Sequence, residues 1–219
     1  LRQDPDIIMI GEIRDDETAR IAVRASITGH LVLSTIHTNN SLNTIERLLD
    51  MDVERYLLGS ALAGIISQRL VKKLCPKCRT SRKATPYEKN VFKQVLGMDI
   101  EDIYTPVGCN DCYKGYHGRV ALQEVLVIDQ RIRDAITNSS KKEDIRKLVY
   151  VKDGTATLLE DGLNKVLEGL TSFEEILRVI DIEDDLGNED VEIKNALIGK
   201  TAQNFTEIKK EENLPIELL

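Results

Sequence analysis

Two short apolar runs, residues 7–10 and 31–36, constrain the fold of this chain more than any other feature. A proline-containing turn at residues 4–6 precedes the first run, and a segment with helical composition, residues 17–26, separates the two. Short apolar runs of this kind are typical of strands in a parallel sheet that is covered on both faces. We therefore predict an α/β fold in which residues 7–10 form a central parallel strand and residues 31–36 a neighbouring one.

Polar residues follow both predicted strands at the point where each strand ends. Glu12 comes just after the first strand, and His37 just after the second. Either residue alone is commonly a solvated loop or turn residue. In open α/β sheets, however, ligands bind at the carboxyl ends of the strands. The pair at matched strand ends therefore predicts a polar site on one edge of the sheet.

Four cysteines form two Cys-x-x-Cys knuckles, Cys75 with Cys78 and Cys109 with Cys112, separated by thirty residues. Tetrahedral Zn²⁺ binds four thiolates, and a two-residue spacer lets both sulfurs of a knuckle reach one ion. The gap exceeds the about 15–20 residues usual for such sites, which a helix within the insertion explains. Four protein ligands leave no open position, so the zinc is predicted to be structural. The alternatives are reduced cysteines in a small core and redox pairs; two pairs in one insertion fit one metal better.

Several motifs together resemble the type II secretion and type IV pilus-assembly ATPases. Residues 1–15, LRQDPDIIMIGEIRD, look like the Walker B segment of that family, and residues 28–39, TGHLVLSTIHTN, look like its histidine box. The resemblance continues through residues 68–71, 75–78, 108–112 and 115–119, and ends near 160–163 and 177–180. It thus covers about four-fifths of the chain, with the motifs in the same order.

The resemblance implies the C-terminal portion of a RecA-like P-loop ATPase core that works as a hexameric ring. Such a motor hydrolyses ATP with Mg²⁺ and drives pilin or pseudopilin assembly or type II protein secretion. It is cytoplasmic and peripheral at the inner membrane, where it binds a platform protein. The family's assembly and secretion members carry the zinc module, whereas retraction members generally do not.

The resemblance also implies roles for individual residues. Glu12 matches the Walker B glutamate, which orients or deprotonates the attacking water, and His37 matches the histidine that contacts the γ-phosphate region. Arg14 follows Glu12 closely and is a candidate contact for a phosphate or a neighbouring subunit. A salt bridge from Arg14 to Asp15 or Asp16 is the alternative.

One motif of the family does not occur. The phosphate-binding pattern G-x-x-x-x-G-K-[ST] is not found in the 219 residues, so the loop that cradles ATP phosphates is missing. We expect the chain to be the C-terminal part of a longer protein and to be inactive as an ATPase by itself. This departure keeps open a second interpretation, a non-catalytic zinc docking module.

Charge distribution bears on the possible partners. Residues 181–219 carry eleven acids and four lysines, which gives them a net charge of −7. The whole chain also has a net charge of −7, so residues 1–180 have a net charge of zero. Nucleic-acid binders usually present a basic face, and with no Trp and three Phe the chain has few residues for stacking on bases. No nucleic-acid partner is therefore expected, although a DNA-linked RecA-like motor of conjugation or competence is a further alternative. No run approaches the about 20 apolar residues of a membrane span.

The predicted organisation has four parts: the ATPase core at 1–74, the zinc insertion at 75–119, a strand with a helical subdomain at 120–180, and an acidic tail at 181–219. Predicted helices cover residues 17–26, 42–51, 54–74, 87–96, 130–137, 142–149, 160–168 and 173–180, with a strand at 121–128. Within the tail, residues 181–190 are expected to be a linker, and 191–198 and 205–210 short helices. A mobile tail without chemistry is the simpler interpretation, and a docking or regulatory role the other.

Overall fold

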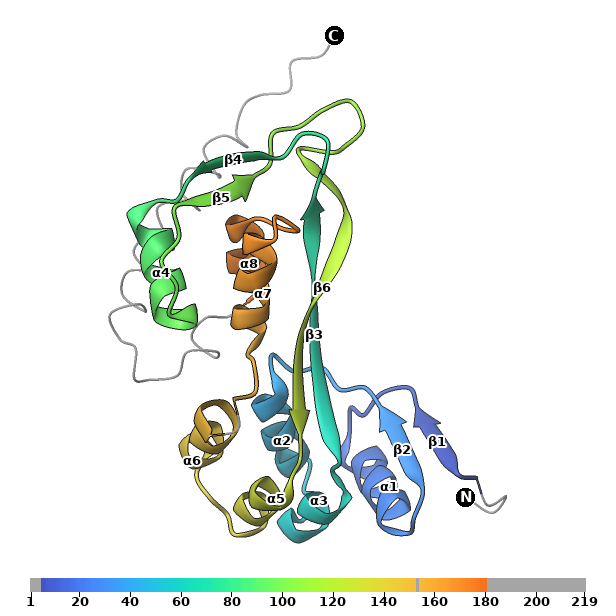
Figure 1. The fold of residues 1–219 in the computed structure, drawn as a ribbon. Coiled ribbons are helices and arrows are strands. Elements are labelled where there is room, and N and C mark those ends of the chain that lie inside the picture. Colours follow the sequence, from blue (N-terminus) through green and yellow to red (C-terminus); the bar gives the residue numbers. More distant parts are fainter. Residues whose placement is uncertain (1–4, 153, 181–219) are drawn as a thin grey trace, which may run out of the picture. The chain divides into compact units, whose positions relative to one another are not determined.

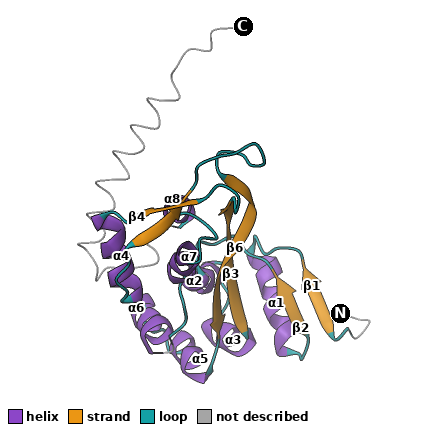
Figure 2. Ribbon diagram, turned by 45° about the horizontal axis from the view of Figure 1, so that its top comes forward, coloured by secondary structure: helices purple, strands orange, loops and turns teal. Residues whose placement is uncertain are grey.

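The computed structural model describes residues 5–152 and 154–180, in which three two-stranded sheets are accompanied by helices (Figures 1 and 2). In chain order the elements are β1 (Ile7–Ile10), α1 (Asp16–Ile27), β2 (Leu31–Ser34), α2 (Ser41–Asp50), α3 (Arg55–Ala61), β3 (Gly64–Leu74), β4 (Thr80–Lys83), α4 (Pro86–Leu96), β5 (Asp102–Thr105), β6 (Tyr116–Val127), α5 (Gln130–Thr137), α6 (Lys142–Arg146), a π-helical segment (Lys147–Lys152), α7 (Leu158–Leu167) and α8 (Phe173–Val179). The expectations for residues 181–219 lie outside the described residues.

Strands β1 and β2 form a parallel pair joined through α1, as predicted, with Ile7 opposite Leu31. The side chain of Asp15 accepts a hydrogen bond from Thr18 N at 2.8 Å and starts α1. The expectation of a central, buried strand is not met. Among the described residues β1 pairs with β2 alone, and Met9 is 69% exposed. β1 is therefore an edge strand in the part of the chain that is described.

The predicted helix over residues 54–74 is wrong in its second half. Helix α3 ends at Ala61, and residues Gly64–Leu74 form β3, an eleven-residue strand. β3 pairs antiparallel with β6 from Gly64 opposite Val127 to Leu74 opposite Tyr116. Helical preference in this segment is overridden by pairing with a strand some fifty residues later, which local sequence does not reveal. We call this pair the β3–β6 ribbon.

The main hydrophobic core lies where one end of the ribbon meets the surrounding helices. Leu58 of α3, Leu126 of β6 and Ile132 and Ile136 of α5 are each at most 1% exposed. The predicted helix at 130–137 coincides with α5. The predicted helix at 142–149 is instead a short α6 that continues as a π-helical segment.

Helices α7 and α8 contact the other end of the ribbon, at an irregularity in β3. The register of β3 against β6 shifts between Lys72 and Leu74. The side chain of Glu175 in α8 accepts from Lys72 N at 3.2 Å, and Thr171 Oγ1 donates to Lys72 O at 2.8 Å. Leu74 N donates to Leu170 O at 2.8 Å. Helix α8 and the connection that precedes it therefore satisfy backbone groups at the irregularity in β3.

The zinc insertion is more regular than predicted. The expected helix around 87–96 is α4, which begins with a capping box between Thr85 and Glu88 and ends at Gly97 in the left-handed conformation. Residues 80–83 and 102–105, where no strand is predicted, form the antiparallel pair β4 and β5. Both strands are short and largely polar, so no alternation of apolar residues marked them. Within residues 5–152 and 154–180, no helix has the length and apolar character needed to cross a membrane.

Candidate functional site: two strand ends and a tetracysteine cluster

The carboxyl ends of β1 and β2 lie side by side, and the loops that leave them are tied together. Thr35 Oγ1 donates to Gly11 O at 2.6 Å, and Ile13 N donates to Thr35 O at 2.8 Å. The parallel register, with Ile10 opposite Ser34, brings the two ends level. Side chains that follow the two strands are therefore held near one another, as the sequence argument requires.

Glu12 is the common partner of the two other predicted residues at this edge. Its Oε2 lies 2.6 Å from Arg14 Nε and 3.4 Å from His37 Nε2. The alternative pairing of Arg14 with Asp15 or Asp16 is not formed, because Asp15 caps α1 and Asp16 contacts Arg20 at 3.4 Å. The hydrogen bond from Thr18 N lowers the pKa of Asp15, which suits that capping role.

This strand-end site is open to solvent. The side chains of His37 and Arg14 are 86% and 72% exposed, and that of Glu12 is 36% exposed. Ion pairs in such surroundings contribute little to stability because water screens them. The arrangement is therefore suited to contacting something that arrives from outside rather than to holding the fold together.

Two residues of the β3–β6 ribbon hold the segment that follows β2, and sequence reasoning missed both. Arg69 Nη2 donates to Thr38 O at 2.9 Å, and the buried Glu124 accepts from Ser41 N at 2.9 Å. Ser41 begins α2, and the preceding Asn40 is the N-cap residue of that helix. A glutamate in the predicted apolar strand of residues 121–128 was the available signal, since charged residues are rarely buried without a partner.

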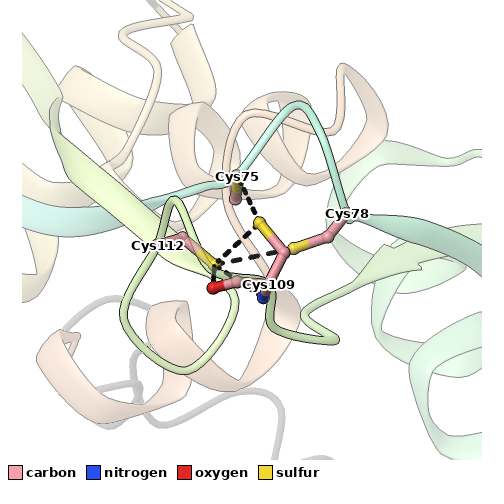
Figure 3. Close-up of side chains that lie close together, drawn as sticks. All are labelled: Cys75, Cys78, Cys109 and Cys112. Carbon is pink, nitrogen blue, oxygen red and sulfur yellow. Dashed lines mark hydrogen bonds between the residues drawn. The ribbon is translucent and has the colours of Figure 1, made fainter.

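The second candidate centre is the tetracysteine cluster, which lies at the far end of the ribbon (Figure 3). The sulfur of Cys75 lies 4.0 Å from that of Cys109, and Cys112 lies 3.7 Å from Cys78 and 3.6 Å from Cys109. All four sulfurs lie within 4.8 Å of one another. Four thiolates at about 2.3 Å from a tetrahedral Zn²⁺ are about 3.8 Å apart. The predicted ligand set is therefore assembled with dimensions that fit zinc.

Backbone N–H groups point at the cysteine sulfurs. Gly108 N donates to Cys78 Sγ and Cys109 N donates to Cys112 Sγ, each at 3.3 Å. Burial raises the pKa of the Cys78 thiol. At Cys112 burial acts in the same direction, but hydrogen bonds from Cys109 and Cys78 outweigh it and lower the pKa to about 7. A thiolate is the form that binds a metal, and the N–H groups of Gly108 and Cys109 are placed to stabilise the negative charge of bound thiolates at Cys78 and Cys112.

The turns around the cluster depend on glycine. Gly115 has φ +84°, and a Cβ there would lie 2.5 Å from the Cβ of Pro106. Gly108 has φ +117°. His117 is exposed and does not belong to the sulfur cluster. Sequence pattern alone thus located all four candidate metal ligands.

A large apolar groove lies between β2 and the β3–β6 ribbon. It has a volume of ≈ 550 Å³ and is lined by parts of α1, α3, β2, β3 and β6. Leu33, Ile66 and Val127 are 49%, 71% and 67% exposed along these strands. The groove offers few charged groups, so it is not itself a site for phosphate chemistry.

Comparison with known proteins places these features in a family. A family model described as "Type II/IV secretion system protein" matches residues 1–178. The chain is 48% identical over 180 residues to type II secretion system protein E of Aeromonas hydrophila, covering 82% of this chain and 35% of that protein. It is 45% identical over 183 residues to the type IV pilus assembly ATPase PilB of Thermus thermophilus, covering 81% of this chain and 20% of that protein.

The fold also resembles a solved structure. The X-ray structure of the Legionella pneumophila ATPase DotB matches 80% of this chain and 38% of that chain, with a TM-score of 0.54 and 25% sequence identity. The mixed α/β architecture is therefore one that a known ATPase shares. The present chain spans only about a third of the Aeromonas hydrophila relative that it matches.

Proposed function

The chain belongs to the type II/IV secretion system protein family, and we propose that it supplies the water-activating edge of a motor ATPase for type II secretion or type IV pilus assembly. The observation that carries this proposal is the position of Glu12. Its carboxylate lies at the end of a parallel strand and within 3.4 Å of the imidazole of His37. This is the edge of an α/β sheet where substrates bind.

In the proposed reaction, Glu12 accepts a hydrogen bond from the attacking water and orients it. Within the described residues, the contacts of Glu12 to Arg14 and His37 both use Oε2, which leaves Oε1 as the oxygen proposed to accept from the water. Arg14 and His37 hold the carboxylate in place. They are also proposed to offer N–H groups to the negatively charged phosphoryl group that is transferred. Positioning of this kind is the main contribution a protein makes to phosphoryl transfer.

The residues at this edge fit part of an ATP site. Bound ATP with Mg²⁺ would supply the γ-phosphoryl group and the cation that offsets its charge. Glu12 is a single carboxylate and suits contact with that cation through water. The phosphate-binding loop has no counterpart in the 219 residues. We therefore propose that hydrolysis needs a phosphate-binding loop from outside this sequence.

The tetracysteine cluster is proposed to hold a structural Zn²⁺. The sulfur separations of 3.6–4.0 Å support it, and with four ligands present no position is left for catalysis. By resemblance the module favours assembly or secretion over retraction. The proposal further includes a hexameric ring and a location at the cytoplasmic face of the inner membrane, through a platform protein. The name "Type II secretion system ATPase E" of one relative supports a role in secretion, whereas the ring, the membrane location and the platform protein rest on the family resemblance.

A chimera tests the proposal. This chain replaces the matching 180 residues of the Aeromonas hydrophila relative, and ATP turnover is compared between the chimera and its Glu12→Gln variant. We expect turnover to fall by ~10²-fold or more with ATP still bound, because a positioned base contributes about that factor. The control is Asp16→Asn, a neighbouring exposed acid that contacts Arg20 instead.

Two results would contradict it. If Glu12→Gln turns over ATP as fast as the chimera, Glu12 does not act on the water. If the chimera assembles like its parent and binds ATP but does not hydrolyse it, the non-catalytic docking module becomes the better description. Turnover that depends on added DNA would instead point to a DNA-linked motor.

A further inference from the structure

We propose that Glu124 and Arg69 are positioning residues that grip the backbone around the His37 loop (residues 35–40) from the β3–β6 ribbon and so fix His37 beside Glu12. The inference rests on the proposed function for what His37 does, but the grip itself is a property of this chain. It assigns a role to the buried carboxyl group of Glu124 and the guanidinium of Arg69, neither of which takes part in the chemistry proposed for Glu12.

Glu124 is an unusual residue to find in the middle of a strand. It is fully buried, and its Oε1 accepts from Ser41 N at 2.9 Å. Its Oε2 is buried too and has no hydrogen-bond partner anywhere in residues 5–152 and 154–180. Burying a carboxylate with one oxygen unpaired costs free energy. An apolar residue would serve the ribbon better, so stability alone does not explain a glutamate at this position.

Arg69 complements Glu124 in charge and in what it binds. Its Nη2 donates to Thr38 O at 2.9 Å and to Asn39 O at 3.3 Å. The guanidinium thus holds two carbonyl groups, and the carboxyl group of Glu124 holds one N–H group just beyond them. These three contacts are made to backbone atoms, and a fourth joins Arg69 Nη2 to Asn39 Oδ1 at 3.3 Å. The grip therefore acts mainly on the path of the chain.

The ribbon presents both groups on one face. Glu124 is paired with Ser67 across the ribbon, and Arg69 is two residues farther along the same strand as Ser67. Residues two apart in a strand point to the same side. Ser67 Oγ also lies 3.2 Å from Ser41 Oγ, which adds a third contact at the start of α2. The spacing of the grip is therefore fixed by the strand ladder, which is more rigid than a loop.

His37 needs such support because little else holds it. Its side chain is 86% exposed, and Glu12 at 3.4 Å is its contact among the described residues. The loop is pinned at its start by Thr35, which donates to Gly11 O. The grip by Arg69 and Glu124 pins its end. His37 lies between the two pinned points, so loss of either changes how far the imidazole lies from Glu12.

The test uses the 219-residue chain without nucleotide. The NMR signal of the His37 ring is assigned with His37→Gln, and its shift on introducing Glu12→Gln is taken as the measure of contact between the two residues. We expect that shift to fall at least about two-fold in Glu124→Ala and in Arg69→Gln, and to persist in Glu124→Gln, whose amide oxygen can still accept from Ser41 N. Exchange of the Ser41 amide with solvent should speed up about ten-fold in Glu124→Ala, as expected for loss of one hydrogen bond.

Glu175→Ala is the matched control. Glu175 is a second buried glutamate that accepts a backbone hydrogen bond from the ribbon, at Lys72 and far from the His37 loop. It should destabilise the chain and leave the His37 shift intact.

The proposal is overturned if Glu124→Ala and Arg69→Gln leave that shift unchanged, if Glu175→Ala reduces it equally, or if Glu12→Gln does not move the signal at all. Should Glu124→Ala fail to fold, Arg69→Gln decides, since Arg69 is partly exposed. None of these readouts uses ATP. The proposal can therefore fail while the turnover test succeeds, or the reverse.

Discussion

The carboxylate of Glu175 in α8 accepts a hydrogen bond from the backbone nitrogen of Lys72, where β3 slips in register against β6. The same side chain contacts Lys72 Nζ at 3.2 Å and Arg178 Nη1 at 2.8 Å. A backbone group freed by a strand irregularity is thus satisfied by a helix from the end of the described chain. This contact attaches the C-terminal helices to the ribbon.

Replacing Glu175 by Ala should therefore destabilise the fold. The change leaves Lys72 N without its acceptor in a partly buried position, and we expect a loss of about 1–3 kcal/mol in the free energy of unfolding. Urea unfolding followed by circular dichroism measures it. The neighbouring Glu174, whose side chain is 53% exposed, provides the control Glu174→Ala, which should change stability by less than about 0.5 kcal/mol. Equal effects of the two variants would show that the contact with Lys72 contributes nothing.

Removing zinc should loosen the cysteine module. We expect one zinc per chain by elemental analysis, and loss of it in Cys109→Ser, because three thiolates hold the ion less well than four. Limited proteolysis should then cut within residues 75–119. His117→Ala serves as the control and should retain the metal, since His117 lies outside the sulfur cluster. A chelator that strips zinc without exposing residues 75–119 to protease would argue that the metal does not support the module.

Stability should fall at acid pH partly through Glu88. Burial acts to raise the pKa of this carboxyl, but hydrogen bonds from Arg82 and from the backbone of Thr85 outweigh it and lower the pKa overall. A lowered folded-state pKa means that the stabilisation is complete above the unfolded value of about 4.3 and is lost as pH falls through the folded value. In Glu88→Gln, the free energy of unfolding should depend less on pH in this range.

The measurement for Glu88 is the difference in unfolding free energy between the native chain and Glu88→Gln from pH 7 to pH 3. Zinc loss on acidification affects both proteins, so it cancels in the difference. The difference should shrink below about pH 4.3. A difference that stays constant with pH would mean that the Arg82–Glu88 pair, at 2.6 Å, is not retained in solution.

Exposed apolar strands should make the chain bind hydrophobic dyes. Met9 of β1 and Leu33 of β2 are 69% and 49% exposed, although strands of parallel sheets are ordinarily covered on both faces. We expect bound ANS to fluoresce strongly and the signal to drop in the double variant Met9→Lys, Leu33→Lys. Val107→Lys alters an equally exposed apolar residue near the cysteines and should have little effect. Unchanged fluorescence in the double variant would place the dye elsewhere.

Local sequence predicted those parts of the structure that depend on neighbouring residues. The strand at residues 7–10, the helix that Asp15 caps and the two cysteine knuckles are each specified within a few positions of the chain. The meeting of Glu12 and His37 followed from the general rule that parallel strands end at one edge.

Features that depend on distant partners were missed. The local sequence of residues 64–74 predicts a helix, because the partner strand β6 lies some fifty residues away. Pairing of β3 with β6 outweighs the local helical preference. The role of Glu124 is not visible in the local sequence, because the ribbon has to form before Glu124 can accept the hydrogen bond from Ser41 N. The start of β6 was likewise placed at residue 121 instead of Tyr116, because the first residues of the strand are polar and glycine-containing.

The β3–β6 ribbon has one more consequence, for how the chain is connected. β3 leads directly into Cys75, and β6 starts four residues after Cys112. In topological terms, residues 75–115 are the loop of a single β-hairpin, enlarged until it holds its own strands, helix and cysteine cluster. The ladder from Gly64 opposite Val127 to Lys72 opposite Arg119 lies wholly outside that loop. The loop nevertheless returns to the rest of the chain, because its buried Phe92 packs against Phe173 of α8 with ring centroids 6.1 Å apart.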